Sequence, residues 1–440
     1  MQRMSWDKLL SDKRDVVFDE EPQDIRSEFF RDYDRIVFSS AFRRLARKTQ
    51  VHPLSFNDHV HNRLTHSIEV SSVGRSLGYA VGLKLKSIEN DLPEKFTPST
   101  IASIIQAACV AHDIGNPPFG HAGEYAIRQW FSENSLKISN LNDKRMIHDL
   151  VNFEGNAQGF RVVSKLENHL NEGGLRLTFA TLGTLIKYPW PSDHPYAIEN
   201  EKFNILLSDE DVFKKLSDDL GLIYKERGEY CRHPLSYLME AADDICYKII
   251  DIEDAIELGI LRFDDVLDCF EKITPGEHID TYGEAVFARR RFIPLRSSAI
   301  ESLINEVSRV FIENYDLIMT GEFEGDLFSK INGSVKDGIN SIKSLTSKNI
   351  FSNRRKVELE VGSYSTIEIL LDAFISAVNE IMDENKKVSF KSKRILELLD
   401  EPINRADGYY ENYLRIVDFV SGMTDNYATY IAKQIEGSAK

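Results

Sequence analysis

A histidine and an aspartate stand side by side at His112 and Asp113, directly after an apolar stretch with the spacing of a buried helix. On such a helix His112 shares a face with Ile105 and Ala108. A lone histidine on an apolar face is usually a hydrogen-bonded core residue. A buried carboxylate beside it, however, is costly unless it is paired or bound to a metal ion. The pair is therefore a candidate for metal coordination.

Two further side chains of the same kinds lie in other apolar helical stretches. His66 is on the apolar side of residues 64–85, and Asp243 lies in the sequence AADDICYKII. Each alone also fits a core histidine or an aspartate bonded to amide groups. Together with the His–Asp pair they offer two imidazoles and two carboxylates from three helices. Such a mixed set suits a divalent cation and, on a six-coordinate ion, leaves positions open for water and substrate.

A second group of polar residues follows a sharp turn. The sequence NPPFG resists continuation of the helix because proline fixes φ, and Gly120 permits a tight bend. His121 and Glu124 come next, and their spacing brings them to one face of a new helix. Imidazole exchanges a proton near neutral pH, which favours acid–base chemistry here. A helix start with a glutamate stabilised by the helix dipole explains the same pattern.

Composition and charge narrow the class of protein. The chain has 440 residues, 42% of them hydrophobic, and a net charge of −16, which argues against a surface coated for nucleic acid. Basic runs at 43–48, 289–291 and 354–356 could still focus an anionic ligand. The four cysteines are widely spaced, as expected for reduced core thiols. Because no signal peptide and no run of about 18 apolar residues appears, we predict a cytoplasmic protein without a membrane span.

Helical periodicity dominates nearly the whole chain. Apolar residues recur at spacings of three to five in residues 64–85, and prolines mark the first turns of helices at Pro98 and Pro234. Residues 297–319 and 366–384 also have amphipathic helical patterns. We therefore predict an all-α fold.

The strand candidates are few, and the best of them, GLRLTFATL at 174–182, fits a helix equally well. The predicted organisation is an N-terminal extension at 1–30, a catalytic helical core at 31–320 and a helical C-terminal region at 321–440.

Longer strings point to one family. The order His66, His112-Asp113, Asp243 resembles that of the HD-domain metal phosphohydrolases. Five strings further resemble the bacterial deoxyguanosine-triphosphate triphosphohydrolases, relatives of the vertebrate HD-domain dNTP triphosphohydrolase. They are RDYDRIVFSSAFRRLARKTQV (31–51), HNRLTHSIEVS (61–71), AHDIGNPPFGHAGE (111–124), NFEGNAQGFR (152–161) and AADDICY (241–247). The likeness implies that the core is an HD domain.

The resemblance also implies a metal and a proton-transfer group. One divalent ion, which the sequence does not identify among Mg, Mn, Ni, Fe and Zn, would be held by four ligands. These ligands are His66, His112, Asp113 and Asp243. His121 would act as proton donor or acceptor at the reacting phosphate, and Glu124 would orient it.

The same family comparison assigns substrate contacts. Tyr247 and Asp251 lie one and two helical turns after the metal aspartate. Tyr247 would pack on the deoxyribose, leaving no room for a 2′-hydroxyl, and Asp251 would bind the 3′-hydroxyl. Gln50 resembles a glutamine that also contacts the sugar. Arg63 and Lys187 are candidates for the triphosphate, because long cationic side chains suit a phosphate group.

The implied reaction is hydrolysis of a dNTP, most favourably dGTP, to deoxynucleoside and inorganic triphosphate through attack of water on the α-phosphorus. One alternative is another HD-domain phosphohydrolase, acting on an alarmone or a nucleoside monophosphate. A second is a catalytically idle regulator that binds nucleotides or single strands, which the basic runs would suit. We expect a homo-oligomer, and an activating nucleotide or single-stranded DNA stays open as a further partner.

Overall fold

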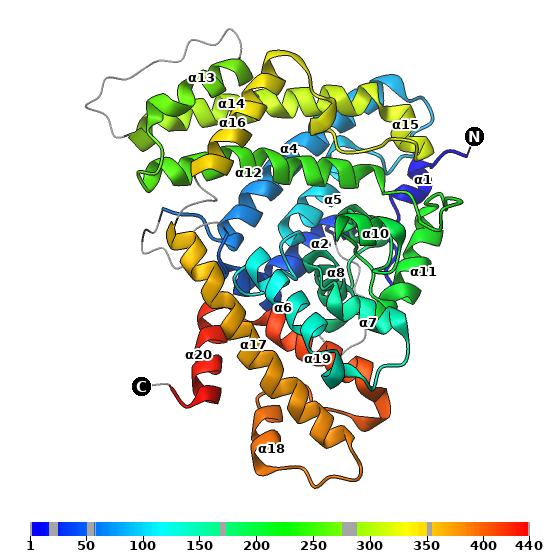
Figure 1. Cartoon of the computed structure of the whole chain (residues 1–440). Helices are drawn as coiled ribbons and strands as arrows, with labels where there is room; N and C mark the ends of the chain where they lie inside the picture. Colours follow the sequence, from blue (N-terminus) through cyan, green and yellow to red (C-terminus); the bar gives the residue numbers. More distant parts are fainter. Residues whose placement is uncertain are drawn as a thin grey trace.

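Two groups of helices, each with its own hydrophobic core, make up the structure (Figure 1). The computed structural model describes residues 2–16, 25–50, 57, 59–167, 173–274, 288–349 and 354–438. Within these ranges the chain forms helices and no sheet, which confirms the predicted all-α fold.

The first core is enclosed mainly by α4, α5, α12 and α14, and the N-terminal α1 also packs into it. In Figure 1, α12, α13, α14 and α16 form one side of the molecule. The helices of this group are α1 (Trp6–Leu9), α2 (Glu28–Val37), α3 (Ser40–Arg44), α4 (Arg63–Ile88), α5 (Pro98–Ala111), α9 (Phe179–Leu185), α11 (Glu210–Leu220), α12 (Pro234–Glu257), α13 (Phe263–Ile273), α14 (Ala288–Glu313), α15 (Tyr315–Thr320) and α16 (Gly333–Asn349).

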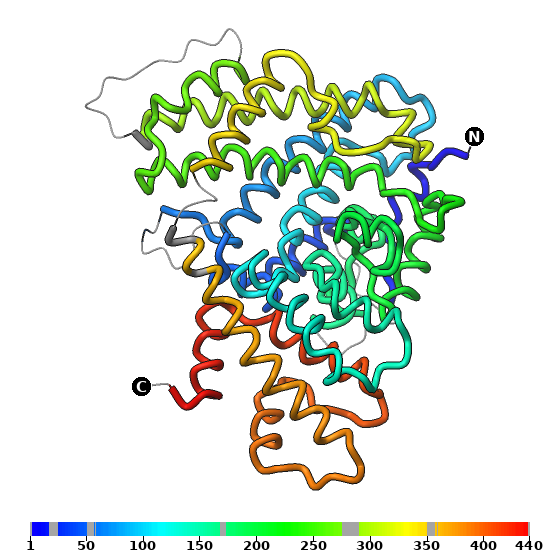
Figure 2. The backbone as a smooth tube through the Cα atoms, in the orientation of Figure 1, coloured from blue at the N-terminus to red at the C-terminus, as the bar shows by residue number. Residues whose placement is uncertain are grey.

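The second core joins helices from the middle of the chain to its C-terminal part. Figure 2 shows the C-terminal part, coloured orange to red, on the side of the molecule away from α13, α14 and α16. Between the cores lies α8 (Gly155–Arg161), which contributes Phe160 to the first and Ala157 to the second. The remaining helices of this group are α6 (His121–Glu133), α7 (Lys144–Val151), α10 (Pro195–Asn200), α17 (Arg354–Met382), α18 (Phe390–Leu396), α19 (Gly408–Gly422) and α20 (Asp425–Glu436).

One part of α17 is apolar enough for a second interpretation. Residues Glu360–Met382 contain an 18-residue window with a mean hydropathy of 1.3, so by length and composition alone they could cross a membrane. The sequence analysis predicted an amphipathic helix at 366–384 and no membrane span, because charged residues interrupt the apolar run. Its apolar side chains, among them Leu370 and Phe374, fill the second core, and a core helix meets the same criterion.

A row of glycines brings α4 and α5 into close contact. A methyl group on Gly78 would lie 2.8 Å from the Cα atom of Ala102, and one on Gly82 would lie 2.8 Å from the Cα atom of Pro98. The two helices are antiparallel, so the start of α4 lies beside the end of α5. This packing places His66, in the first turn of α4, close to His112, which is the C-cap residue of α5.

The turn after α5 crosses α8 with the two backbones in contact. Gly115 has φ of 105°, and a methyl group there would lie 2.1 Å from the backbone nitrogen of Gly159. In the other direction, a methyl group on Gly159 would lie 2.2 Å from the carbonyl oxygen of Ile114. Only glycine fits at such a crossing. The two strings HDIGNPP and FEGNAQG therefore meet in space.

Candidate active site

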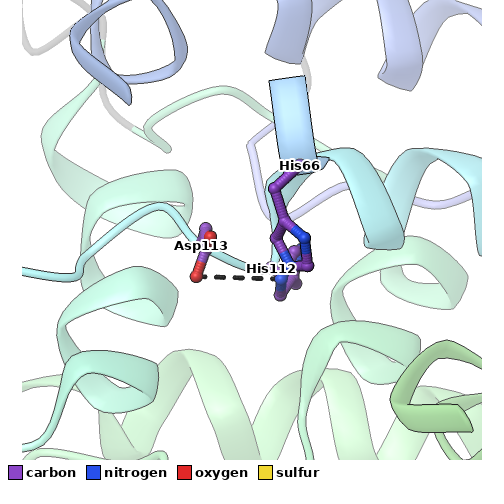
Figure 3. A group of neighbouring side chains, drawn as sticks. All are labelled: His66, His112 and Asp113. Carbon is purple, nitrogen blue, oxygen red and sulfur yellow. Dashed lines mark ion pairs between the residues drawn. The ribbon is translucent and has the colours of Figure 1, made fainter. Parts of the chain in front are cut away.

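The predicted metal ligands come together at the start of α4 and the end of α5 (Figure 3). One ligand atom from each of His66, His112 and Asp113 lies within 4.8 Å of the others, and all three residues are buried. On α12, Oδ1 of Asp243 lies 3.1 Å from Nε2 of His66 and 3.4 Å from Nε2 of His112. Two imidazoles and two carboxylates thus face one another from three helices.

The donor atoms of this cluster fit a divalent cation. Nδ1 of His112 lies 2.7 Å from the carbonyl oxygen of Cys109, so the Nδ1–H group donates there and the lone pair of Nε2 points into the cluster. Oδ2 of Asp113 is buried and accepts no hydrogen bond from the described residues. A buried carboxylate oxygen with nothing to bind is costly unless a cation occupies the position beside it. The cluster could therefore hold a metal ion.

Two cationic side chains neutralise the carboxylates of the cluster. Arg63 donates to Oδ1 of Asp113 at 2.7 Å, and Lys187 donates to Oδ2 of Asp243 at 3.2 Å. Burial alone raises the pKa of both aspartates. The charge of Arg63 nevertheless lowers the pKa of Asp113, and His112 and Lys187 hold the pKa of Asp243 well below its usual value. Both aspartates are therefore ionised, as metal ligands must be.

His121 and Glu124 form a hydrogen-bonded pair at the start of α6. Oε2 of Glu124 lies 2.8 Å from Nδ1 of His121, and Oε1 accepts the backbone N–H of Gly155 at 2.8 Å. Burial raises the pKa of Glu124, but its bond to His121 and the charge of Lys202 lower it to about 2. The ionised carboxylate accepts the Nδ1–H group, which leaves Nε2 available. The side chain of His121 is 76% exposed, so Nε2 can meet a ligand.

Two contacts connect this pair to the His/Asp cluster. Arg63, which binds the cluster aspartate, also lies against the turn before the pair: a methyl group on Gly120 would lie 2.7 Å from its Nη2 atom. Asn116 donates to Oδ1 of Asp113 at 2.7 Å. Its own side-chain oxygen would lie 3.0 Å from a methyl group on Gly155, the residue that binds the glutamate of the pair. The two groups of residues are thus neighbours.

The residues that we predicted to contact the sugar lie farther along α12 and on the segment before α4. Tyr247 is half-buried and Asp251 is buried. The pKa of Tyr247 is raised by burial and by the charges of Asp251 and Asp243, so its phenol is neutral and lies near both carboxylates. Gln50 is half-buried, and its Oε1 atom accepts no hydrogen bond from the described residues.

A cavity of about 1120 Å³ opens beside Lys187. Its volume suits a ligand of nucleotide size. Tyr237 and Glu240, which line it, precede Asp243 on α12, whereas the tyrosine and aspartate assigned to the sugar follow it. The cavity therefore lies on the opposite side of the cluster from the residues assigned to the sugar. Among its other lining residues are Tyr188, Trp190, Lys202 and Arg232.

Four residues of this neighbourhood were not identified from the sequence. Asn116 and Gly155 lie inside the strings HDIGNPPFG and FEGNAQ, so the strings themselves were the available signal. Lys202, which binds Glu154 at 2.7 Å, and Asp425, whose contacts are described below, have no local pattern that marks them.

The fold and the cluster together define an all-α protein with a His/Asp cluster that could hold a metal ion. No family model matches the chain. A Pseudomonas aeruginosa protein named deoxyguanosinetriphosphate triphosphohydrolase-like protein is 44% identical over 422 residues, which cover 94% of each chain. A Synechocystis sp. protein of the same name is 37% identical over 452 residues and 99% of each chain.

A third relative carries the name without the qualifier. The deoxyguanosinetriphosphate triphosphohydrolase of Yersinia pestis is 32% identical over 490 residues, covering 93% of this chain and 94% of its own. The chain therefore belongs to the deoxyguanosinetriphosphate triphosphohydrolase family, as its sequence motifs predicted.

Proposed function

We propose that the chain hydrolyses a deoxynucleoside triphosphate, most favourably dGTP, to a deoxynucleoside and inorganic triphosphate by attack of water on the α-phosphorus. The observation that carries this proposal is the cluster of two histidines and two aspartates between α4, α5 and α12, beside two cationic side chains. Three of its members are buried and Asp243 is half-buried. The names of the relatives support a triphosphohydrolase activity on a guanine deoxynucleotide.

The cluster and its two cations suit a phosphate chain. When bound, a divalent cation supplies Lewis-acid polarisation of phosphoryl oxygens. Arg63 and Lys187 bring two positive charges to the same place, and such charges stabilise the negative charge that develops on a reacting phosphate. The cavity beside Lys187 offers room for the β- and γ-phosphates on the side away from the sugar residues.

His121 suits the proton transfer of this reaction. A bond forms between water oxygen and the α-phosphorus, the bond to the 5′-oxygen breaks, and that oxygen gains a proton as the deoxynucleoside leaves. Nε2 of His121 is exposed, and Glu124 fixes the ring through Nδ1. An imidazole held by a carboxylate is a common proton donor and acceptor in catalysis.

Tyr247 suits the selection of deoxyribose. It lies one helical turn after Asp243, so a nucleotide with its α-phosphate at the cluster would bring its sugar to the ring. A ring packed against C2′ excludes a 2′-hydroxyl by contact. Asp251, one turn farther along, would accept the 3′-hydroxyl, and the unsatisfied Oε1 of Gln50 offers a further acceptor.

Product analysis tests the reaction. The protein, supplied in turn with each of Mg²⁺, Mn²⁺, Ni²⁺, Fe²⁺ and Zn²⁺, is incubated with every dNTP and NTP, and the products are separated by chromatography. We expect dGTP to give deoxyguanosine and triphosphate, with ¹⁸O from labelled water in the triphosphate. A nucleoside monophosphate or free phosphate as first product would contradict attack on the α-phosphorus. Binding without turnover over the whole panel would favour the idle regulator.

The sugar assignment has its own test. We expect Tyr247→Ala to weaken dGTP use and to narrow the ratio of kcat/KM for dGTP over GTP by about 10-fold or more. Asp251→Ala should lower catalysis without making GTP a good substrate. If Tyr247→Ala keeps the wild-type ratio, the sugar is selected elsewhere, and Gln50 is the next residue to test.

A further inference from the structure

A buried aspartate of the C-terminal region reaches the site described above. Asp425 is the first residue of α20 and is 3% exposed. Its Oδ1 atom accepts the backbone N–H of Phe119 at 2.9 Å. Its Oδ2 atom accepts the backbone N–H and the hydroxyl of Thr49 at 3.0 and 2.6 Å. One carboxylate thus binds two segments that lie 306 and 376 residues earlier in the chain.

Both segments lead directly to residues of the site. Thr49 precedes Gln50, and Phe119 precedes the glycine before His121. Phe119 has φ of 67°, a left-handed conformation that is unfavourable for a residue with a side chain. Such a residue keeps its conformation only when its surroundings hold it there. The hydrogen bond from its N–H group to Asp425 is one such restraint.

Lys48 strengthens the same junction. It is buried, and its Nζ atom donates to the carbonyl oxygens of Asn116 at 2.5 Å and of Ser421 at 2.7 Å. Phe119 also packs against the second core, which the C-terminal helices build. The turn before α6 is therefore attached to the C-terminal region by hydrogen bonds and by apolar contact.

An aspartate at the start of a helix is also favoured by the helix dipole, which is the simpler explanation of Asp425. The helix, however, has another cap: the side chain of Thr424 accepts the backbone N–H of Tyr427. The two oxygens of Asp425 are directed at other segments instead. The geometry is that of a residue that joins parts of the molecule.

We propose that Asp425 is a positioning residue of the reaction, which fixes the segment carrying Gln50 and the turn carrying His121 in one arrangement. The proposal rests on the proposed function of the site. A carboxylate is needed because both of its oxygens accept hydrogen bonds, whereas an amide has a single acceptor oxygen. Asp425→Asn keeps the shape of the side chain and can satisfy only one of the two segments.

Kinetics of Asp425→Asn test the effect on the reaction. We expect kcat for dGTP to fall by about 10- to 100-fold, as displacement of a reacting group by a fraction of an ångström to an ångström does. In a His121→Ala background the same substitution should lower kcat less than it does in the wild type, because one of the two groups it positions is gone. Effects of the two substitutions that multiply would contradict positioning through His121.

Asn412→Ala is the matched control. Asn412 is fully buried in the same region and donates to the carbonyl oxygens of Asn404 and Gly408, away from both site segments. Its removal should lower the melting temperature while kcat per folded molecule stays within about twofold. If Asn412→Ala lowers kcat as much as Asp425→Asn does, the effect is one of general stability and the proposal is wrong.

Hydrogen exchange gives a readout that does not depend on activity. In Asp425→Asn, peptides containing Thr49 and Phe119 should exchange at least about 10-fold faster, and in Asn412→Ala they should not. If the wild type hydrolyses no dNTP while these amides respond, the proposed function is wrong and the positioning of the two segments stands. If the wild type is active and Asp425→Asn changes neither exchange nor kcat, the inference is overturned.

Discussion

The cluster of His66, His112, Asp113 and Asp243 and the His121–Glu124 pair are neighbours that are held in different ways. The cluster lies inside the first core, where close packing of α4 against α5 and α12 leaves its buried side chains little freedom. The pair begins α6, its histidine is 76% exposed, and it follows a turn with two residues of positive φ. The backbone N–H of Gly155 donates to its glutamate, and Asp425 accepts a hydrogen bond from the backbone N–H of Phe119 in its turn.

The difference predicts two kinds of sensitivity to substitution. Helix packing determines the place of each cluster residue, so loss of one ligand removes a function without moving the others. The pair depends on hydrogen bonds between segments far apart in the chain, so several distant substitutions should each lower the rate in part.

The largest effect is expected for Asp243→Asn. Loss of a charged ligand should lower kcat/KM for dGTP by more than the about 10²- to 10³-fold that removal of a single electrostatic donor costs, with helix content by circular dichroism retained. The neighbouring Asp244 binds Lys248 at 2.5 Å instead of facing the imidazoles, so Asp244→Asn is the matched variant. It should lose far less activity. Equal losses in the two variants would mean that the cluster is not the reacting centre.

A smaller effect is expected for Glu124→Gln. The amide can still accept the N–H group of Gly155 but no longer fixes the imidazole as a carboxylate does. We expect kcat to fall by about 10²-fold with KM nearly unchanged, since proton transfer by a positioned side chain contributes about 10²- to 10⁴-fold. Metal content, measured by elemental analysis, should stay at the wild-type level. Loss of metal in this variant would show that pair and cluster are not separate units.

The helices that we predicted correctly from the sequence are those marked by a local sequence pattern. The predicted helices at 64–85 and from Pro98 and Pro234 are α4, α5 and α12, because apolar periodicity and a proline in the first turn are local signals. His66 and Asp243 lie on α4 and α12, His112 and Asp113 directly follow α5, and the structure brings the four proposed ligands together. Helical spacing and the family resemblance were sufficient to predict these helices and the four proposed ligands.

Features determined by contacts between distant segments were not predicted. The segment GLRLTFATL, which fitted a strand or a helix equally well, contains a turn and then the start of α9, because Thr178 caps a helix that begins at Phe179. The helical pattern at 297–319 is divided at Asn314 between α14 and α15. The bonds of Asp425 to two earlier segments follow from packing of the second core, and no local pattern reports such a bond.

Gly155→Ala should have a moderate effect, mainly through the pair. A methyl group there would lie 2.7 Å from Oε1 of Glu124, a contact too short to persist, so the glutamate must move. We expect kcat to fall by about 10-fold with metal content unchanged. Gly362 in α17 has nothing within 4 Å of an added methyl group, so Gly362→Ala should instead stabilise the protein by about 0.5–1 kcal/mol. An unchanged kcat in Gly155→Ala would mean that the glutamate tolerates displacement.

The smallest effect is expected for His61, which joins the segment before α4 to α12. Its Nδ1 atom lies 2.7 Å from Oδ1 of Asp254, and Nε2 lies 3.3 Å from Glu69. Burial lowers the pKa of His61, but the hydrogen bonds to Asp254 and Glu69 raise it to about 10. A folded-state pKa above the unfolded value gives stability that is fully present below about pH 6.5 and is lost as the pH rises through about 10.

His61→Asn should therefore lower the free energy of unfolding by about 1.5–3 kcal/mol at pH 6, the range for hydrogen bonds to charged groups, and by much less at pH 10.5. Chemical denaturation of wild type and variant at both pH values measures this difference and cancels the titration of other groups. His233 is the control, because burial lowers its pKa to about 4 and it is neutral at both pH values. The cost of His233→Asn should not shrink between pH 6 and pH 10.5, because its imidazole takes up a proton at pH 6 only in the unfolded chain, which makes the wild type slightly less stable there. A cost of His61→Asn that does not shrink with pH would mean that the ion pairs add nothing to the packing that holds α4 against α12.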